Sequence, residues 1–116
     1  MHATSLTDLA ETQLAIAREA SSGRSAATVF GGQEHDLRQT LIALAEGRAL
    51  GEHEAPGEAT LLVLRGRVRV ESPDGDVEAS TGNLWVLTHE RHSVHAVEDS
   101  VFLLTTLTGL GRASHS

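Results

Sequence analysis

The chain has 116 residues, of which 40% are hydrophobic and 3% aromatic, and it carries a formal net charge of −7. This length fits one domain with a single core, and the apolar content excludes a disordered chain. The absence of cysteine excludes disulfides, thiolate metal sites and a cysteine nucleophile, and the acidic balance argues against a nucleic-acid partner.

The sequence shows no targeting or membrane segment. No apolar run approaches the roughly 18 residues that span a bilayer, and MHATSLTDLAETQ lacks the pattern of a signal peptide. We therefore expect a cytoplasmic protein with no membrane partner. The group Arg65, Arg67 and Arg69 has a period of two, which predicts one solvated face of a strand and no DNA-binding patch.

The first predicted element is an amphipathic helix from residue 5 to about residue 20. Apolar residues recur at helical spacing, at Leu6, Leu9, Ala10, Leu14 and Ala17. Ser5 or Thr7 can cap its start, and the Ser21-Ser22-Gly23 segment supplies its end. We expect this helix to pack on the outside of the domain or on a partner subunit.

After Ala26 the chain reads as short strands joined by turns. The expected strands are Thr28–Phe30, His35–Ala45, Thr60–Val70, Val77–Ala79, Leu84–Leu87, Ser93–Val97 and Val101–Leu107. Gly66 interrupts the longest of them and predicts a bulge or a close backbone approach. Glycine turns at intervals of roughly ten residues favour a sandwich or barrel. The expected organisation is a helix and linker at 1–25, a barrel at 26–108 and a flexible tail at 109–116.

Histidines and one carboxylate near two of these strands suggest a site in the barrel interior. His53, His92 and Glu58 are candidate metal ligands, because a site in a barrel needs nitrogen or oxygen donors that converge from neighbouring strands. His92 and His95 are three apart, so a regular strand sends them to opposite faces. His89 is a further candidate for ligand binding.

Two polar residues interrupt an apolar strand and are candidates for ligand binding. Alternation along the strand requires that either Arg38 or Gln39 faces the interior. A buried arginine needs an acidic partner, so we expect Arg38 to lie opposite Glu58 or another acidic group.

These segments resemble the two motifs of the cupin superfamily, and in particular the small single-domain cupins with a cupin 2 type of barrel. The first motif, G-x5-HxH-x3-4-E-x6-G, is matched by Gly47, His53 and Gly66, and LLVLRGRVRV is similar to its last strand and turn. The second, G-x5-PxG-x2-H-x3-N, is matched by Gly82, the NLWVL strand and His92, with one residue fewer before the histidine. The resemblance covers about residues 35 to 107. It implies an all-β double-stranded β-helix, or jelly roll, with the site in the barrel mouth.

The chain departs from those motifs at most of the ligand positions. Ala55 replaces the second histidine, and Ala59 or Thr60 replaces the glutamate. In the second motif Thr88, Glu90 and Ala96 replace proline, glycine and asparagine. Of the four ligands that the family implies, His53 and His92 are retained, with Glu58 one position early.

The sequence leaves three functions open. The first is a barrel that binds a small molecule or one weakly held divalent transition metal, such as Zn, Fe, Mn or Ni. The second is a metal-dependent cupin enzyme of the oxygenase or isomerase type. The third is a structural or regulatory module with a filled barrel. We also expect a homodimer, because Thr60–Leu64 is apolar on both faces and only one face can fill the barrel.

Overall fold

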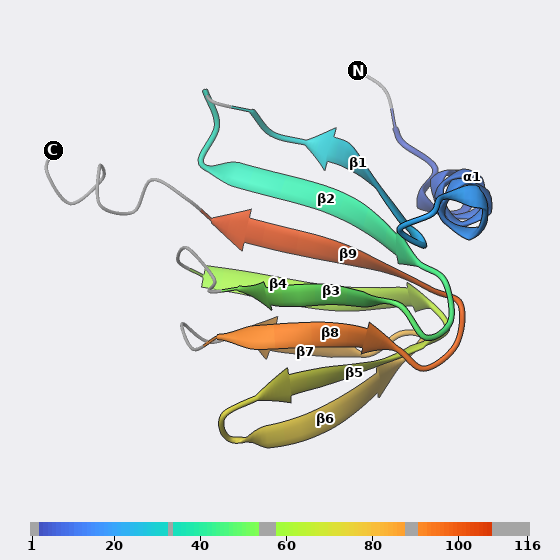
Figure 1. Ribbon diagram of the computed structural model, residues 1–116. Coiled ribbons are helices and arrows are strands. Elements are labelled where there is room, and N and C mark those ends of the chain that lie inside the picture. Colours follow the sequence, from blue (N-terminus) through green and yellow to red (C-terminus); the bar gives the residue numbers. More distant parts are fainter. Residues whose placement is uncertain (1–2, 33, 54–57, 88–90, 108–116) are drawn as a thin grey trace, which may run out of the picture.

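The computed structural model describes residues 3–32, 34–53, 58–87 and 91–107. One helix and nine strands lie in that part of the chain (Figure 1). Their bounds are α1 Leu6–Glu19, β1 Arg24–Phe30, β2 Leu37–Leu44, β3 Ala49–His53, β4 Glu58–Arg65, β5 Arg67–Ser72, β6 Gly75–Ser80, β7 Leu84–Leu87, β8 His92–Ala96 and β9 Ser100–Leu107.

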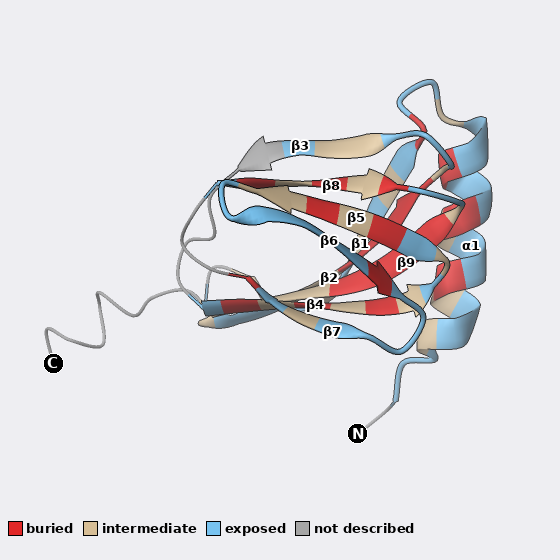
Figure 2. Cartoon of the chain, turned by 90° about the horizontal axis from the view of Figure 1, so that it is seen from below, coloured by how far each residue is buried: buried red, intermediate tan, exposed pale blue. Residues whose placement is uncertain are grey.

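The strands form two sheets that lie face to face. Sheet A has the order β1-β2-β9-β4-β7, and sheet B has the order β3-β8-β5-β6. Every strand pairing is antiparallel. Figure 2 shows the two layers with buried residues between them and the helix at one end. This arrangement confirms the predicted all-β jelly roll with one N-terminal helix.

The core between the sheets is built from small and medium apolar side chains. Alternation along the strands turns Ile42, Leu61, Val70 and Phe102, among others, toward the interior. Phe102 is the largest buried side chain and lies on β9, between β2 and β4. The middle of the barrel is therefore filled with apolar side chains.

The helix α1 covers part of the outer face of sheet A. Ser5 caps it, because the backbone N–H of Asp8 donates to Ser5 Oγ at 3.2 Å. Its buried residues Ala10, Leu14 and Ala17 pack on a second apolar cluster that includes Leu62 and Leu64 of β4. The helix therefore packs on the outside of its own domain, which is the first of the two arrangements expected from the sequence.

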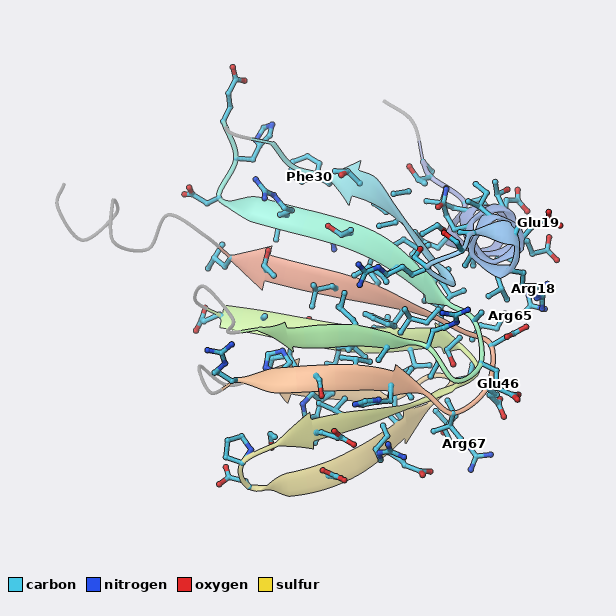
Figure 3. The ribbon with its side chains drawn as sticks, viewed as in Figure 1. Arg18, Glu19, Phe30, Glu46, Arg65 and Arg67 are labelled. Carbon is cyan, nitrogen blue, oxygen red and sulfur yellow. The ribbon has the colours of Figure 1, made fainter. Side chains whose placement is uncertain are left out.

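An ion pair fastens the end of α1 to the turn between β8 and β9. Arg18 Nε lies 2.7 Å from Asp99 Oδ2, and the backbone N–H of Glu46 donates to Asp99 Oδ1 at 2.8 Å. Figure 3 shows Arg18 and Glu46 at the same end of the molecule. The backbone hydrogen bond from Glu46, followed by that from Arg18, lowers the pKa of Asp99.

Gly66 divides the long predicted strand Thr60–Val70 into β4 of sheet A and β5 of sheet B. Its φ is +83°, and a Cβ there would collide with the carbonyl oxygen of Asp99 and the side chain of Ser100. The predicted interruption and close backbone approach at Gly66 are confirmed, and the two parts of the segment lie in different sheets. The change of sheet requires glycine at this position, because a residue with a side chain fits neither the φ nor the space.

The change of sheet at Gly66 also separates the three arginines Arg65, Arg67 and Arg69. Arg65 ends β4, whereas Arg67 and Arg69 lie on the outer face of β5, so the prediction of a single strand face for all three is wrong. Arg67 lies 3.7 Å from Glu78 and 3.6 Å from Glu98, both carboxylate contacts at the surface. Such exposed pairs contribute little to stability.

Other predicted boundaries agree with the structure within a few residues. The Ser72–Asp76 segment contains the hairpin turn between β5 and β6, and β7 has the predicted bounds. β3 was not predicted as a separate strand, and β1 begins at Arg24, inside the expected linker. The expected tail at 109–116 lies outside the described residues. In the described part of the chain, no helix has the length and apolar character needed to cross a membrane.

Candidate ligand pocket at the barrel mouth

The histidines of β8 alternate between the two faces of sheet B. His92, Val94 and Ala96 are buried against the interior, whereas Ser93 and His95 are partly exposed on the outer face. The inference that His92 and His95 face opposite sides is confirmed. His92 is 3% exposed and its Nε2 atom is fully buried, so it is a histidine held inside the barrel.

His53 lies directly across from His92 in the strand pairing. β3 and β8 run antiparallel, and the Cα of His53 is the register partner of the Cα of His92. The structure describes the backbone of His53 and not its side chain. His89 lies outside the described residues.

Glu58 lies on the opposite face of sheet A from the interior. Its register partner on β9 is Leu107, while the next residue, Ala59, is buried and pairs with Thr106. Strand alternation sends Glu58 to the exposed outer face and puts the methyl group of Ala59 inside. The structure therefore does not bring Glu58 together with His92.

The position of Glu58 on the outer face removes one expected ligand from the metal site that the resemblance implies. At the glutamate position Ala59 provides no side-chain donor atom, and Thr60, the alternative residue there, shares the outer face of β4 with Glu58. Among the residues that the structure describes, no three histidine, aspartate or glutamate side chains form a group that could hold a metal ion. The described residues thus do not complete a coordination shell around His92.

Arg38 and Gln39 divide between the two faces of β2. Arg38 has the same parity as Ile42 and Leu44, which face the interior, but its side chain is exposed. Gln39 has the parity of Leu41 on the helix side, and its Nε2 donates to Thr105 Oγ1 at 3.4 Å. The expected alternation is confirmed, but the expected burial of Arg38 opposite Glu58 is wrong, because the two residues lie on opposite faces of sheet A.

A pocket of about 220 Å³ opens beside His92. The β5–β6 hairpin turn that helps to line it lies at the end of the sandwich away from α1 (Figure 1). The pocket lies between the β5–β6 hairpin and β7. The lining residues are Val70, Ser72, Asp74, Gly75, Val77, Trp85, Val86, Leu87 and His92. The pocket combines apolar walls with a few polar groups, as sites for small molecules do.

Three residues that give this pocket its character were not among the predicted site residues: Trp85, Asp74 and Val77. Period-two alternation of the NLWVL strand could have indicated that Trp85 and Leu87 share a face. It could not have indicated that this face meets the β5–β6 hairpin, because β6 and β7 belong to different sheets.

The outer face of sheet B has a separate polar network around His95. Its Nε2 lies 3.0 Å from Glu71 Oε1 and 3.2 Å from Ser93 Oγ, and Arg69 Nη2 lies 3.0 Å from Glu71 Oε2. Desolvation opposes ionisation of Glu71, but the hydrogen bond from Arg69 and the charges of His95 and Arg69 outweigh it and lower the Glu71 pKa. Ser93 and Glu71 both contact the same imidazole nitrogen, so this group is not arranged as a nucleophile relay.

Solved structures with similar folds were found, whereas no family model and no curated protein matches the chain. A conserved protein of unknown function from Streptococcus pyogenes superposes with a TM-score of 0.71 at 22% identity, over 93% of this chain and 90% of that one. A cupin superfamily protein from Desulfitobacterium hafniense has a TM-score of 0.68 at 17% identity, over 73% and 77%. A cupin-2 domain containing protein from Shewanella frigidimarina has a TM-score of 0.60 at 15% identity, over 72% and 79%.

These likenesses agree with the fold that the resemblance to the two motifs implied. The chain has the fold of a small cupin-type domain, as the resemblance implied. Identities below 25% establish the fold and carry no information about activity, because one fold serves many functions.

Proposed function

We propose that this cupin-type barrel binds a small molecule in the pocket beside His92. The observation that supports the proposal is a hollow of about 220 Å³ in which a buried histidine and Trp85 meet apolar strand residues. A cavity of about 150 Å³ lined by apolar groups accepts benzene, so this pocket suits a molecule of one ring with a short substituent.

The filled interior limits where a ligand can sit. Leu61, Val63 and Phe102 occupy the middle of the barrel and are fully buried. The third function considered from the sequence, a filled and inactive module, describes this middle region well. It does not account for the pocket at the mouth.

Occlusion of the pocket tests the proposal. Val77 lines the pocket from β6 and is partly exposed, so Val77→Phe adds bulk to the hollow with little effect on the core. The indole N–H resonance of Trp85, the single tryptophan, reports on binding. We expect added benzyl alcohol to shift this resonance in the natural protein until the shift saturates. In Val77→Phe the affinity for benzyl alcohol should be at least ~10-fold weaker.

The matched control is Leu84→Phe, which adds the same ring on β7 at an exposed residue that does not line the pocket. It should bind benzyl alcohol as the natural protein does. Equal affinity in all three proteins, or no saturable shift in any of them, would contradict the proposal.

A divalent transition metal such as Zn, Fe, Mn or Ni is the second candidate ligand. The register pairing of His53 with His92 favours it, because this pairing places two potential imidazole donors on neighbouring strands. Two imidazoles alone hold such an ion weakly, since protein sites use three or four ligands. A metal-dependent enzyme of the oxygenase or isomerase type would need further ligands at this position.

Metal analysis of untagged protein decides between the two ligands. If the metal proposal is right, protein dialysed against the four ions retains about one equivalent, and His53→Ala lowers the retained amount at least ~10-fold. His95→Ala, on the outer face of β8, should retain as much as the natural protein. Metal-free natural protein after dialysis would exclude this candidate.

We also propose that two copies associate through the outer face of β7. The original reason for a dimer, the outer face of Thr60–Leu64, does not hold, because α1 of the same chain covers Leu62 and Leu64. Support comes instead from Leu84 and Val86, which are 60% and 64% exposed on an edge strand of sheet A. Adjacent exposed aliphatic side chains on an edge strand favour association.

A further inference from the structure

The pocket beside His92 has an uneven distribution of charge. Of its described lining residues, Val70, Val77 and Leu87 form apolar walls. Asp74 is the one carboxylate among them; it lies in the exposed β5–β6 turn, at the rim. Neither arginine nor lysine occurs in that described lining, so the pocket offers negative charge at its entrance and no fixed positive charge.

This distribution of charge favours some ligands over others of the same shape, according to the charge of the ligand. A carboxylic acid would bring a negative charge toward Asp74 and meet repulsion, whereas an ammonium group would be attracted. Trp85 lines the same pocket, and an indole ring attracts a cation that lies over its face more strongly than it attracts a neutral group. The formal net charge of −7 raises the local concentration of cations around the molecule, and this effect also favours a cationic ligand.

We propose that the ligand class of this pocket is a small primary amine with an apolar body. The apolar part lies between the valine and leucine walls, and the ammonium group lies at the rim beside Asp74. The volume of about 220 Å³ limits the apolar part to about one ring or a short branched chain. This proposal rests on the proposed function, because it concerns the same pocket.

Three probes that share a ring and differ in charge test the preference. Benzylamine, benzyl alcohol and benzoate are titrated separately into the protein, and the single indole N–H resonance of Trp85 is followed by NMR. We expect benzylamine to bind about fivefold more tightly than benzyl alcohol, because this factor is the upper range of what an exposed charge pair contributes. Benzoate should bind more weakly than both.

A pair of variants assigns the preference to Asp74. Asp74→Asn should reduce the ratio of the two dissociation constants, benzyl alcohol to benzylamine, to about one. Asp76→Asn makes the same change of charge two residues away, where Asp76 faces Arg69 outside the pocket, and should keep the natural ratio. Because each ratio is taken within one protein, a general loss of stability does not affect it.

The outcomes separate this proposal from the one on which it rests. Benzylamine binding no more tightly than benzyl alcohol, benzoate binding best, or a ratio unchanged in Asp74→Asn would each overturn the preference for amines and leave the pocket intact. Failure of all three probes to shift the indole resonance would overturn both proposals.

Discussion

Gly66 decides at the scale of one residue how the chain passes from one sheet to the other. Its backbone carbonyl accepts from the N–H of Thr81, and its position beside Asp99 and Ser100 has no room for a side chain. Ser100 is itself fully buried and accepts the N–H of Arg67 at 3.0 Å. The glycine and the serine thus meet where the chain passes from sheet A to sheet B.

Substitution of Gly66 by alanine should destabilise the protein through both φ and steric overlap. A left-handed φ costs a non-glycine residue about 1–2 kcal/mol, and the collision with backbone adds about 1–3 kcal/mol. Gly82→Ala is the control, because Gly82 has a φ of +89° but open space around its Cβ position. Urea denaturation should show the larger loss at Gly66, and equal losses would mean that the steric overlap relaxes without cost.

At the scale of an element, the register of β4 decides what its side chains can do. One face of β4 turns Ala59 and Leu61 inward, and the other turns Leu62 toward α1. Glu58 lies on the helix side of the sheet because the alternation has a period of two. A shift of one residue would be needed to bring this carboxylate to His92, and it would expose the core residues of the strand.

The attachment of α1 should depend on pH through Asp99. Because the Asp99 pKa is lowered in the folded protein, its contribution to stability is complete above the ordinary aspartate pKa of about 3.9 and is lost as the pH falls through the lowered value. Asp99→Asn should cost about 1 kcal/mol at pH 7, given that the side chain is one-third exposed.

Urea denaturation of both proteins at pH 7 and pH 3 measures this effect. The difference in the free energy of unfolding between natural protein and Asp99→Asn should narrow at pH 3. A difference that stays constant would show that the charge of Asp99 does not stabilise the helix contact.

At the scale of the whole molecule, the two sheets have different surroundings. The outer face of sheet B is covered by ion pairs among Arg67, Arg69 and nearby carboxylates. The outer face of sheet A is covered by α1 over β2, β9 and part of β4, but β7 keeps two exposed aliphatic side chains. Among the residues that the structure describes, β7 thus carries the two most exposed large apolar side chains.

Light scattering tests the homodimer at micromolar concentration. We expect a mass of about twice 12.3 kDa for the natural protein, and a shift toward the monomer in Val86→Glu, because a charge would be buried in the interface. Ile16→Glu places the same charge on the exposed side of α1 and should stay dimeric. A monomer for the natural protein, or a dimer for Val86→Glu, would exclude this interface.

The sequence by itself determined the local elements and the fold. Helical spacing predicted α1, short strands with glycine turns predicted a sandwich or barrel, and the resemblance of two segments to the cupin motifs implied the jelly roll. The opposite orientation of His92 and His95 also followed from spacing alone. The helix, the strands and the orientation of the two histidines depend on neighbours within a few residues, so local chemistry is sufficient to predict them, whereas the jelly roll was implied by the resemblance.

Only the tertiary structure decided the character of the site. The pairing of β4 with β9 placed Glu58 outside, and the meeting of β7 with the β5–β6 hairpin brought Trp85 and Asp74 to His92. These contacts join strands that are distant in sequence or belong to different sheets, and they depend on the register of each strand and on the change of sheet at Gly66. No spacing along the chain encodes which two faces meet across a core.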